Sequence, residues 1–171
     1  MSLRRDSILF LVVGCAYALG SQMAFQWFDA DGFSATFFPA SGVTLSALAL
    51  TAARRWPVVL AAVFTAEVLM DVAHDIPAAA SIGYAFANVC EPLIGATLLR
   101  RFVHTPDLSR TRDLFVFLSC AVVVGPAVGG VIGATNYVTV AGGTEPWGDF
   151  MTQWWIGDGL GVLVVASAVL A

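Results

Sequence analysis

The sequence contains no lysine and few charges of either sign. Charged residues make up 12% of the chain, against about 25% in soluble proteins. The formal net charge is −4, so no basic face exists to contact phosphates, which excludes nucleic-acid binding. Hydrophobic residues make up 58%, and the mean hydropathy is strongly positive. The chain is therefore expected to be an integral membrane protein, with the lipid bilayer as its first partner.

Histidine and cysteine are also scarce. The three cysteines fall in separate apolar segments, which fits neither a disulfide framework nor a metal-ligand spacing. His74 and His104 fall on opposite sides of the membrane in the topology inferred below, so a two-histidine metal site or a Ser–His–Asp triad is not expected. No phosphate-binding loop or metalloprotease helix occurs. We expect no enzyme activity, no metal and no cofactor; an intramembrane enzyme using carboxylates is the least favoured alternative.

Long apolar runs occupy most of the 171 residues. At about 20 residues per crossing, they predict one all-α domain, residues 1–171, built as a bundle of six transmembrane helices. The expected spans are approximately 7–25, 37–53, 57–73, 78–99, 114–140 and 150–171. The N-terminal run after Arg4-Arg5 resembles a signal peptide, but its length and unclear cleavage pattern favour a retained first helix.

The basic residues indicate the orientation of the chain. All of them are arginines, and all stand before the first expected span or after the second and fourth: Arg4, Arg5, Arg54, Arg55, Arg100, Arg101, Arg110 and Arg112. The loops after the first, third and fifth spans have none. The positive-inside rule then places both termini in the cytoplasm.

Carboxylates inside the expected spans are the main functional signal. There are four, namely Glu67, Asp71, Glu91 and Asp158. Burying a charged side chain at the bilayer centre costs about 2.5–3.5 kcal/mol on insertion scales, so each needs a compensating interaction. Glu67 and Asp71 share one helix face, and Asn88 shares another with Glu91.

Depth and helix face suggest that these groups converge on one cavity that opens to the outer side. Further polar or helix-breaking positions at similar depth join them: Pro39, Ser41, Gly42 and Asn136. No arginine reaches this depth. The carboxylates must therefore be protonated, hydrogen-bonded to neutral neighbours, hydrated in a cavity, or paired with an exogenous cation.

The roles of individual residues remain open at this point. For Glu91 and Asp158, a ligand, ion or proton site is favoured over a structural hydrogen-bonded role, whereas Glu67 fits both equally. Asp71 lies close enough to the boundary to be a solvated surface residue. Trp154 and Trp155 are most simply interface anchors, although one of them could wall a pocket and stack on an aromatic or cationic ligand.

Small residues repeat every four positions in three of the expected spans. The clearest case is Gly125, Gly129 and Gly133, and Pro126 should kink the same helix. Such stripes allow helix backbones to approach closely. Packing within the bundle is the favoured interpretation, and a homodimer face is the alternative.

Four ordered motifs give the chain a family resemblance. They are Phe38-Pro39-Ala40-Ser41-Gly42-Val43, Arg55-Trp56-Pro57, Asn88-x-x-Glu91 with Leu98-Leu99-Arg100-Arg101-Phe102, and Trp154-Trp155-Ile156-Gly157-Asp158-x-Leu160-Gly161-Val162-Leu163. Together they resemble the first type of bacterial membrane-associated sensor domain, the MASE family, over almost the whole chain. The resemblance implies a functional set made of Pro39, Ser41, Gly42, Asn88, Glu91, Trp154, Trp155 and Asp158.

Members of that family are N-terminal input modules of histidine kinases and of enzymes that make or degrade cyclic-di-GMP. The resemblance therefore implies a sensory domain of the bacterial inner membrane, active in two-component or cyclic-di-GMP signalling. It would sense a ligand, ion or proton at the carboxylate pocket and relay it through the last helix to a fused or separate cytoplasmic output domain. The family is usually longer, so the chain is expected to be either an excised input domain or a short stand-alone version.

A transport component is the rival hypothesis. Six spans in a chain of this length also match the substrate-binding membrane subunits of vitamin or other small-molecule uptake systems. That analogy rests on size alone.

Overall fold

The computed structural model describes residues 2–27, 35–103 and 108–170. Its longer helices are α1 (Ser2–Trp27), α2 (Pro39–Leu50), α3 (Trp56–Ala73), α4 (Ala78–Phe102), α6 (Gly125–Thr139) and α7 (Trp147–Gly161). Shorter elements extend them: the 3₁₀ turn η1 (Ala53–Arg55), α5 (Thr111–Val116), the π-helices η2 (Phe117–Val124) and η3 (Val162–Ala166), and α8 (Ser167–Leu170). The predicted all-helical membrane bundle is confirmed.

Within the described residues, five helical rods are long and apolar enough to cross a membrane. They are α1, η1 with α3, α4, the α5–η2–α6 rod and the α7–η3–α8 rod. The expected second span differs, because α2 has only 12 residues. A helix of that length is about 18 Å long, well short of the roughly 30 Å hydrocarbon core. Pro39 opens α2 in its first turn, and extended backbone at Thr51 and Ala52 ends it.

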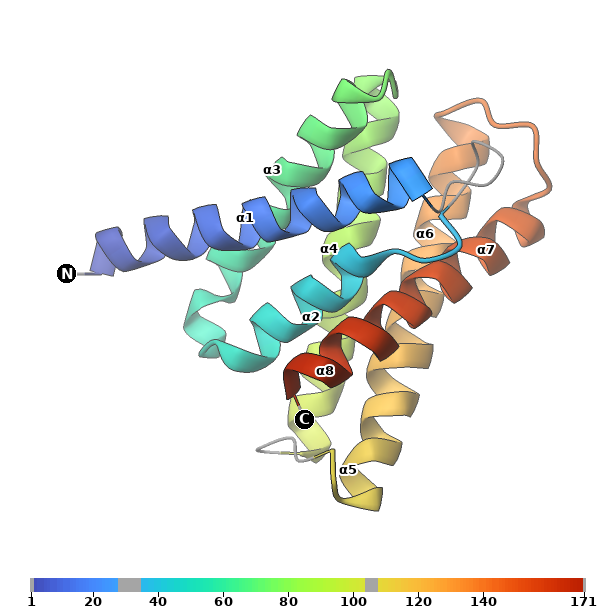
Figure 1. Cartoon of the computed structure of the whole chain (residues 1–171). Helices are drawn as coiled ribbons and strands as arrows, with labels where there is room; N and C mark the ends of the chain where they lie inside the picture. The colour runs from blue at the N-terminus through green and yellow to red at the C-terminus, as the bar shows by residue number, and fades with distance from the viewer. Residues whose placement is uncertain (1, 28–34, 104–107, 171) are drawn as a thin grey trace.

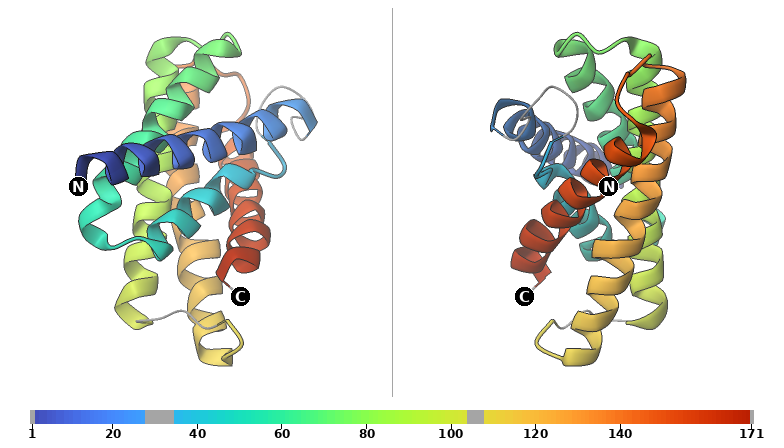
Figure 2. Two further views of the ribbon diagram at one scale, coloured as in Figure 1. Left: turned by 60° about the vertical axis from the view of Figure 1, so that its left-hand side comes forward. Right: turned by 90° about the vertical axis from the view of Figure 1, so that its right-hand side faces the viewer.

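The helices pack around α4 and α2. Figures 1 and 2 show α4 and the α5–η2–α6 rod standing side by side, with α3 beside α4 and α1 crossing α3 obliquely. The short α2 lies between α1, α4 and the α7–η3–α8 rod, and two thirds of its residues are buried. It is therefore a central packing element in spite of its length.

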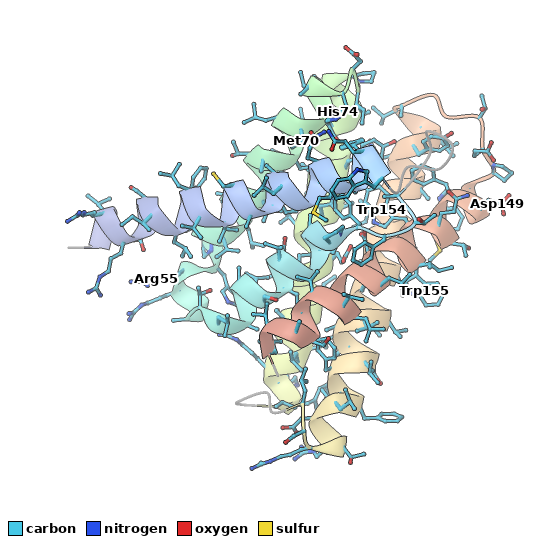
Figure 3. All side chains as sticks on the ribbon, in the orientation of Figure 1. Arg55, Met70, His74, Asp149, Trp154 and Trp155 are labelled. Carbon is cyan, nitrogen blue, oxygen red and sulfur yellow. The ribbon has the colours of Figure 1, made fainter. Side chains whose placement is uncertain are left out.

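One end of the bundle is held by arginines. The Arg100 guanidinium donates a hydrogen bond to the Leu48 carbonyl oxygen at 2.8 Å and lies 4.7 Å from the centre of the Trp56 ring. Arg55 forms a 3.3 Å ion pair with Asp6, near the start of α1 (Figure 3). These contacts bring the first turns of α1 and α3 together with the last turns of α2 and α4. We call this the arginine end, and the opposite end the arginine-free end.

The glycine stripe of α6 lies inside the bundle, as expected. A Cβ added at Gly125 would lie 3.0 Å from the main-chain oxygen of Glu91, and one at Gly133 would lie 2.7 Å from the Trp154 ring. These glycines therefore allow α6 to approach α4 and α7 closely. Pro126 is the second residue of α6, two residues beyond the end of η2, and its ring nitrogen has no hydrogen to donate into that π-helix.

Candidate ligand cavity

A cavity of about 300 Å³ lies toward the arginine-free end of the bundle. The C-terminal parts of α1, α3 and α6, the N-terminal half of α4 and one face of α7 contribute to it. Its polar lining consists of four carboxylates, two tyrosines, one amide and one indole: Glu67, Asp71, Asp75, Asp158, Tyr84, Tyr137, Asn88 and Trp154. Four of the residues expected at a site, Glu67, Asn88, Trp154 and Asp158, thus share one cavity.

Glu67 is held by neutral donors on two neighbouring helices. The Tyr17 hydroxyl, on α1, donates to Glu67 Oε2 at 2.9 Å, and the Asn88 amide, on α4, donates to Oε1 at 2.5 Å. Both carboxylate oxygens thus accept a hydrogen bond without any cation. Of the ways to compensate a buried carboxylate, Glu67 uses hydrogen bonding to neutral neighbours.

Asp71 and Asp158 lie in the cavity wall with unsatisfied oxygens. Their side chains are 2% and 4% exposed, and the Oδ2 atom of each has no hydrogen-bond partner. The expectation that Asp71 is a solvated surface residue is therefore wrong, because Asp71 lies on the buried side of the last turn of α3. A buried polar atom without a partner carries the full cost of its lost hydration. These two oxygens, on residues that line the cavity, therefore carry an unmet need for a hydrogen bond.

Glu91 lies deeper in the bundle than the cavity lining. It is 1% exposed, and neither of its carboxylate oxygens has a hydrogen-bond partner. Asp158, Ser41 and Trp154 lie beside it without reaching hydrogen-bond geometry. On its other side a Cβ at Gly129 would lie 2.7 Å from Oε2. Asp158 therefore faces both the cavity and the buried Glu91.

Aromatic rings form one wall of the cavity. The Trp154 ring centre lies 5.6 Å from that of Tyr84 and 5.9 Å from that of Phe150, and Phe150 stacks on Tyr137 at 4.0 Å. All four rings line the cavity. Sequence analysis named only Trp154, because an aromatic residue in an apolar span gives the same signal whether it lines a cavity or packs in a core.

The α2 residues of the expected site pack on α7 and do not line the cavity. Just before α2, the Phe38 amide donates to the Gly157 carbonyl oxygen at 3.0 Å. A Cβ at Gly42 would collide with Gly161 and come within 2.6 Å of Val165 Cβ. Pro39 opens this helix, and Ser41 lies beside Glu91. These positions therefore hold α2 against the helix that carries Asp158.

Two further expected site residues also lie outside the cavity lining. Asn136 donates a hydrogen bond to the Ala80 carbonyl oxygen at 2.8 Å and so links α6 to α4. The Trp155 indole donates to the Val123 carbonyl oxygen at 2.9 Å, on the side of α7 away from Trp154 (Figure 3). Each satisfies a main-chain carbonyl of a neighbouring helix.

Within residues 2–27, 35–103 and 108–170, no three metal-ligating side chains gather closely enough to hold a metal ion. His74 stacks on Phe25 with ring centres 4.1 Å apart, while His104 lies outside the described residues.

The comparison with known families gives a match over nearly the whole chain. The family model MASE1 matches residues 7–171, which includes most of α1 and every later helix. No curated protein and no solved structure matched the sequence. The match to the MASE1 family model is therefore the comparison that assigns the chain to a family.

Proposed function

The chain belongs to the MASE1 family, whose members are membrane sensor domains of signalling proteins, and from this premise we propose that its own sensing site is the cavity at the arginine-free end. A ligand, ion or proton entering the cavity would change the interactions of Asp158 and, through it, of Glu91. The domain itself would carry no catalytic step. Its role would be to pass the change to an output domain.

The orientation of the bundle belongs to the same proposal. The arginine end would face the cytoplasm of a bacterial cell and the cavity would open outward, across the inner membrane. Both termini would then be cytoplasmic. A sensor arranged in this way samples the medium outside the cell and reports inward.

Asp158 is the single observation that carries the proposal. Its side chain is buried in the cavity wall with an unpartnered oxygen, about 16 Å along α7 from Trp147. The same helix continues through η3 and α8 to the arginine side of the bundle. One continuous rod thus connects the cavity to the membrane face where an output domain would stand.

The relay would act at the contact between α7 and α2. Gly157 and Gly161 bring the α7 backbone against Phe38 and Gly42. A small displacement of α7 would therefore require α2 to move with it. Packed interfaces of this kind shift between discrete arrangements and do not deform continuously. A ligand shifts them only when its affinity differs between the two arrangements.

Substitution of the carboxylates in a full-length signalling protein tests the proposal. Asp158→Asn and Glu91→Gln remove the charge while keeping size, so we expect an altered kinase or cyclic-di-GMP output with normal membrane insertion. Asp149→Asn is the matched control, because Asp149 lies exposed in the first turn of the same helix, outside the cavity. Wild-type output in both cavity variants, or an equal change in the control, would contradict the proposal.

A further inference from the structure

We infer that the cavity takes a small organic cation, an amine or a quaternary ammonium compound. This inference rests on the proposed function, since it names the chemical class that the same cavity would sense. Three features carry it: the unbalanced negative charge of the lining, the aromatic wall, and the absence of a metal-type cluster among the described residues. Each has a different physical basis.

The charge of the lining is entirely of one sign. Four carboxylates and no arginine line the cavity, and the arginines of the described chain lie at the other end of the bundle. Glu67 is satisfied by Tyr17 and Asn88, but Asp71 Oδ2 and Asp158 Oδ2 have no partner. An N–H donor of positive charge would supply both the missing hydrogen bonds and the missing counter-charge. An anionic ligand would meet four carboxylates and no basic side chain.

The aromatic wall matches the apolar part of such a ligand. Trp154 stands beside Asp158 one helical turn away and contacts the Tyr84 and Phe150 rings. Ring faces attract alkylammonium groups, and tryptophan does so most strongly. Carboxylates combined with aromatic faces therefore select a cation with a hydrocarbon shell over a small, strongly hydrated one.

The volume of the cavity and the arrangement of its acidic side chains also favour a small organic cation. A volume of about 300 Å³ is at the lower end of the roughly 300–1,000 Å³ of small-molecule sites, so the ligand would be small. In the part of the chain that the structure describes, no three acidic, histidine or cysteine side chains converge as a bare metal ion requires.

Binding measurements on the purified chain in lipid nanodiscs test the inference. The probes are choline and phenethylammonium, with 3,3-dimethyl-1-butanol as the uncharged isostere of choline and sodium chloride to match ionic strength. Calorimetry should show saturable binding of at least one cationic probe and none of the alcohol. Failure of both cations to bind, or equal binding of choline and its isostere, would overturn the inference.

Two matched pairs of variants locate the site. Asp158→Asn should weaken cation binding by at least about tenfold, because it removes a buried charge partner, whereas Asp149→Asn on the same helix should leave it unchanged. Trp154→Leu should weaken binding by about 3- to 30-fold, and Trp155→Leu should not. Asp71→Asn provides a second carboxylate variant in case Asp158→Asn fails to fold, which size-exclusion chromatography would reveal. Equal effects within each pair would overturn the inference.

The binding and signalling results are separable. Cation binding with the expected variant effects supports the inference even where the cation leaves the output of the full-length protein unchanged, and that second result counts against the proposed function alone. Conversely, output that depends on Asp158 in a protein that binds neither cation supports the proposed function and overturns this inference.

Discussion

At the scale of single residues, the buried acids differ in how they are satisfied. Glu67 has a donor for each oxygen, Asp71 and Asp158 each leave one oxygen bare, and Glu91 leaves both bare. Glu67 accepts hydrogen bonds from a tyrosine and an asparagine. The Glu91 side chain packs against Gly129 and lies beside Asp158, Ser41 and Trp154, none of which hydrogen-bonds to it. We therefore expect the best-satisfied acid, Glu67, to act as a structural anchor and the less satisfied acids to respond to a ligand.

Tyr17→Phe tests the anchoring role of Glu67. The substitution leaves Glu67 Oε2 buried without a donor, so we expect a loss of stability of about 1–3 kcal/mol. Thermal unfolding in detergent would measure it as a lower midpoint. Tyr137→Phe is the control, since the Tyr137 hydroxyl only accepts a long 3.4 Å bond from the Glu145 amide. Equal midpoints for the two variants would argue against an anchoring role.

At the scale of elements, close backbone contacts decide which helices neighbour each other. Gly125 and Gly129 bring α6 against Glu91 on α4, and Gly42 brings α2 against α7. The four-residue spacing of glycines predicted close packing inside the bundle, and the contacts of α6 confirm it. The sequence did not predict which neighbouring helix each glycine stripe contacts, because glycine has no side chain that would distinguish one neighbouring helix from another.

Gly129→Ala and Gly148→Ala form a matched pair at this scale. A Cβ at Gly129 would lie 2.7 Å from Glu91 Oε2 and 3.0 Å from Glu91 Cβ, so the variant should lose about 1–3 kcal/mol through overpacking. A Cβ at Gly148 meets nothing within 4 Å, and alanine there should be neutral or up to about 1 kcal/mol stabilising. Comparison of unfolding midpoints checks the pair. Similar midpoints would show that α6 can move away from α4.

The helix boundaries show what hydropathy can and cannot determine. Five rods match the expected spans because each has a long apolar run. The expected span at 37–53 contains a helix of only 12 residues. The prediction was too long because mean hydropathy averages over Phe37 and Thr51 and does not detect where the backbone becomes extended. Proline at position 39 marked the start of this helix, but no comparable signal marked its end.

At the scale of the whole molecule, charge and cavity lie at opposite ends. Arg55 and Arg100 link helices at one end, while carboxylates and aromatic rings gather toward the other. Depth and helix face predicted that Glu67, Asn88 and Asp158 meet at one cavity, and all three line the cavity described above. The same criteria missed Tyr84, Tyr137 and Phe150, which look like core residues in sequence. They also placed Asn136 at the cavity, because depth does not reveal the direction of a side chain.

Labelling with a membrane-impermeant thiol reagent tests the proposed orientation. In a cysteine-free background, Thr144→Cys lies in the exposed loop between α6 and α7, and Ser109→Cys lies in the exposed turn before α5. We expect Thr144→Cys to react in intact spheroplasts and Ser109→Cys to react only after lysis. The reverse pattern would invert the topology and move the cavity mouth to the cytoplasmic side.

The π-helix η3 has a mechanical consequence for the last rod. It begins four residues after Asp158 and joins α7 to α8, so it holds wider backbone turns between the cavity and the far membrane face. Converting such turns to ordinary α-helix changes the register by one residue, which rotates everything beyond Ala166 by about 100° about the helix axis. If a changed interaction at Asp158 converted η3 to α-helix, the C-terminal end of the rod would therefore rotate about its own axis at the far membrane face.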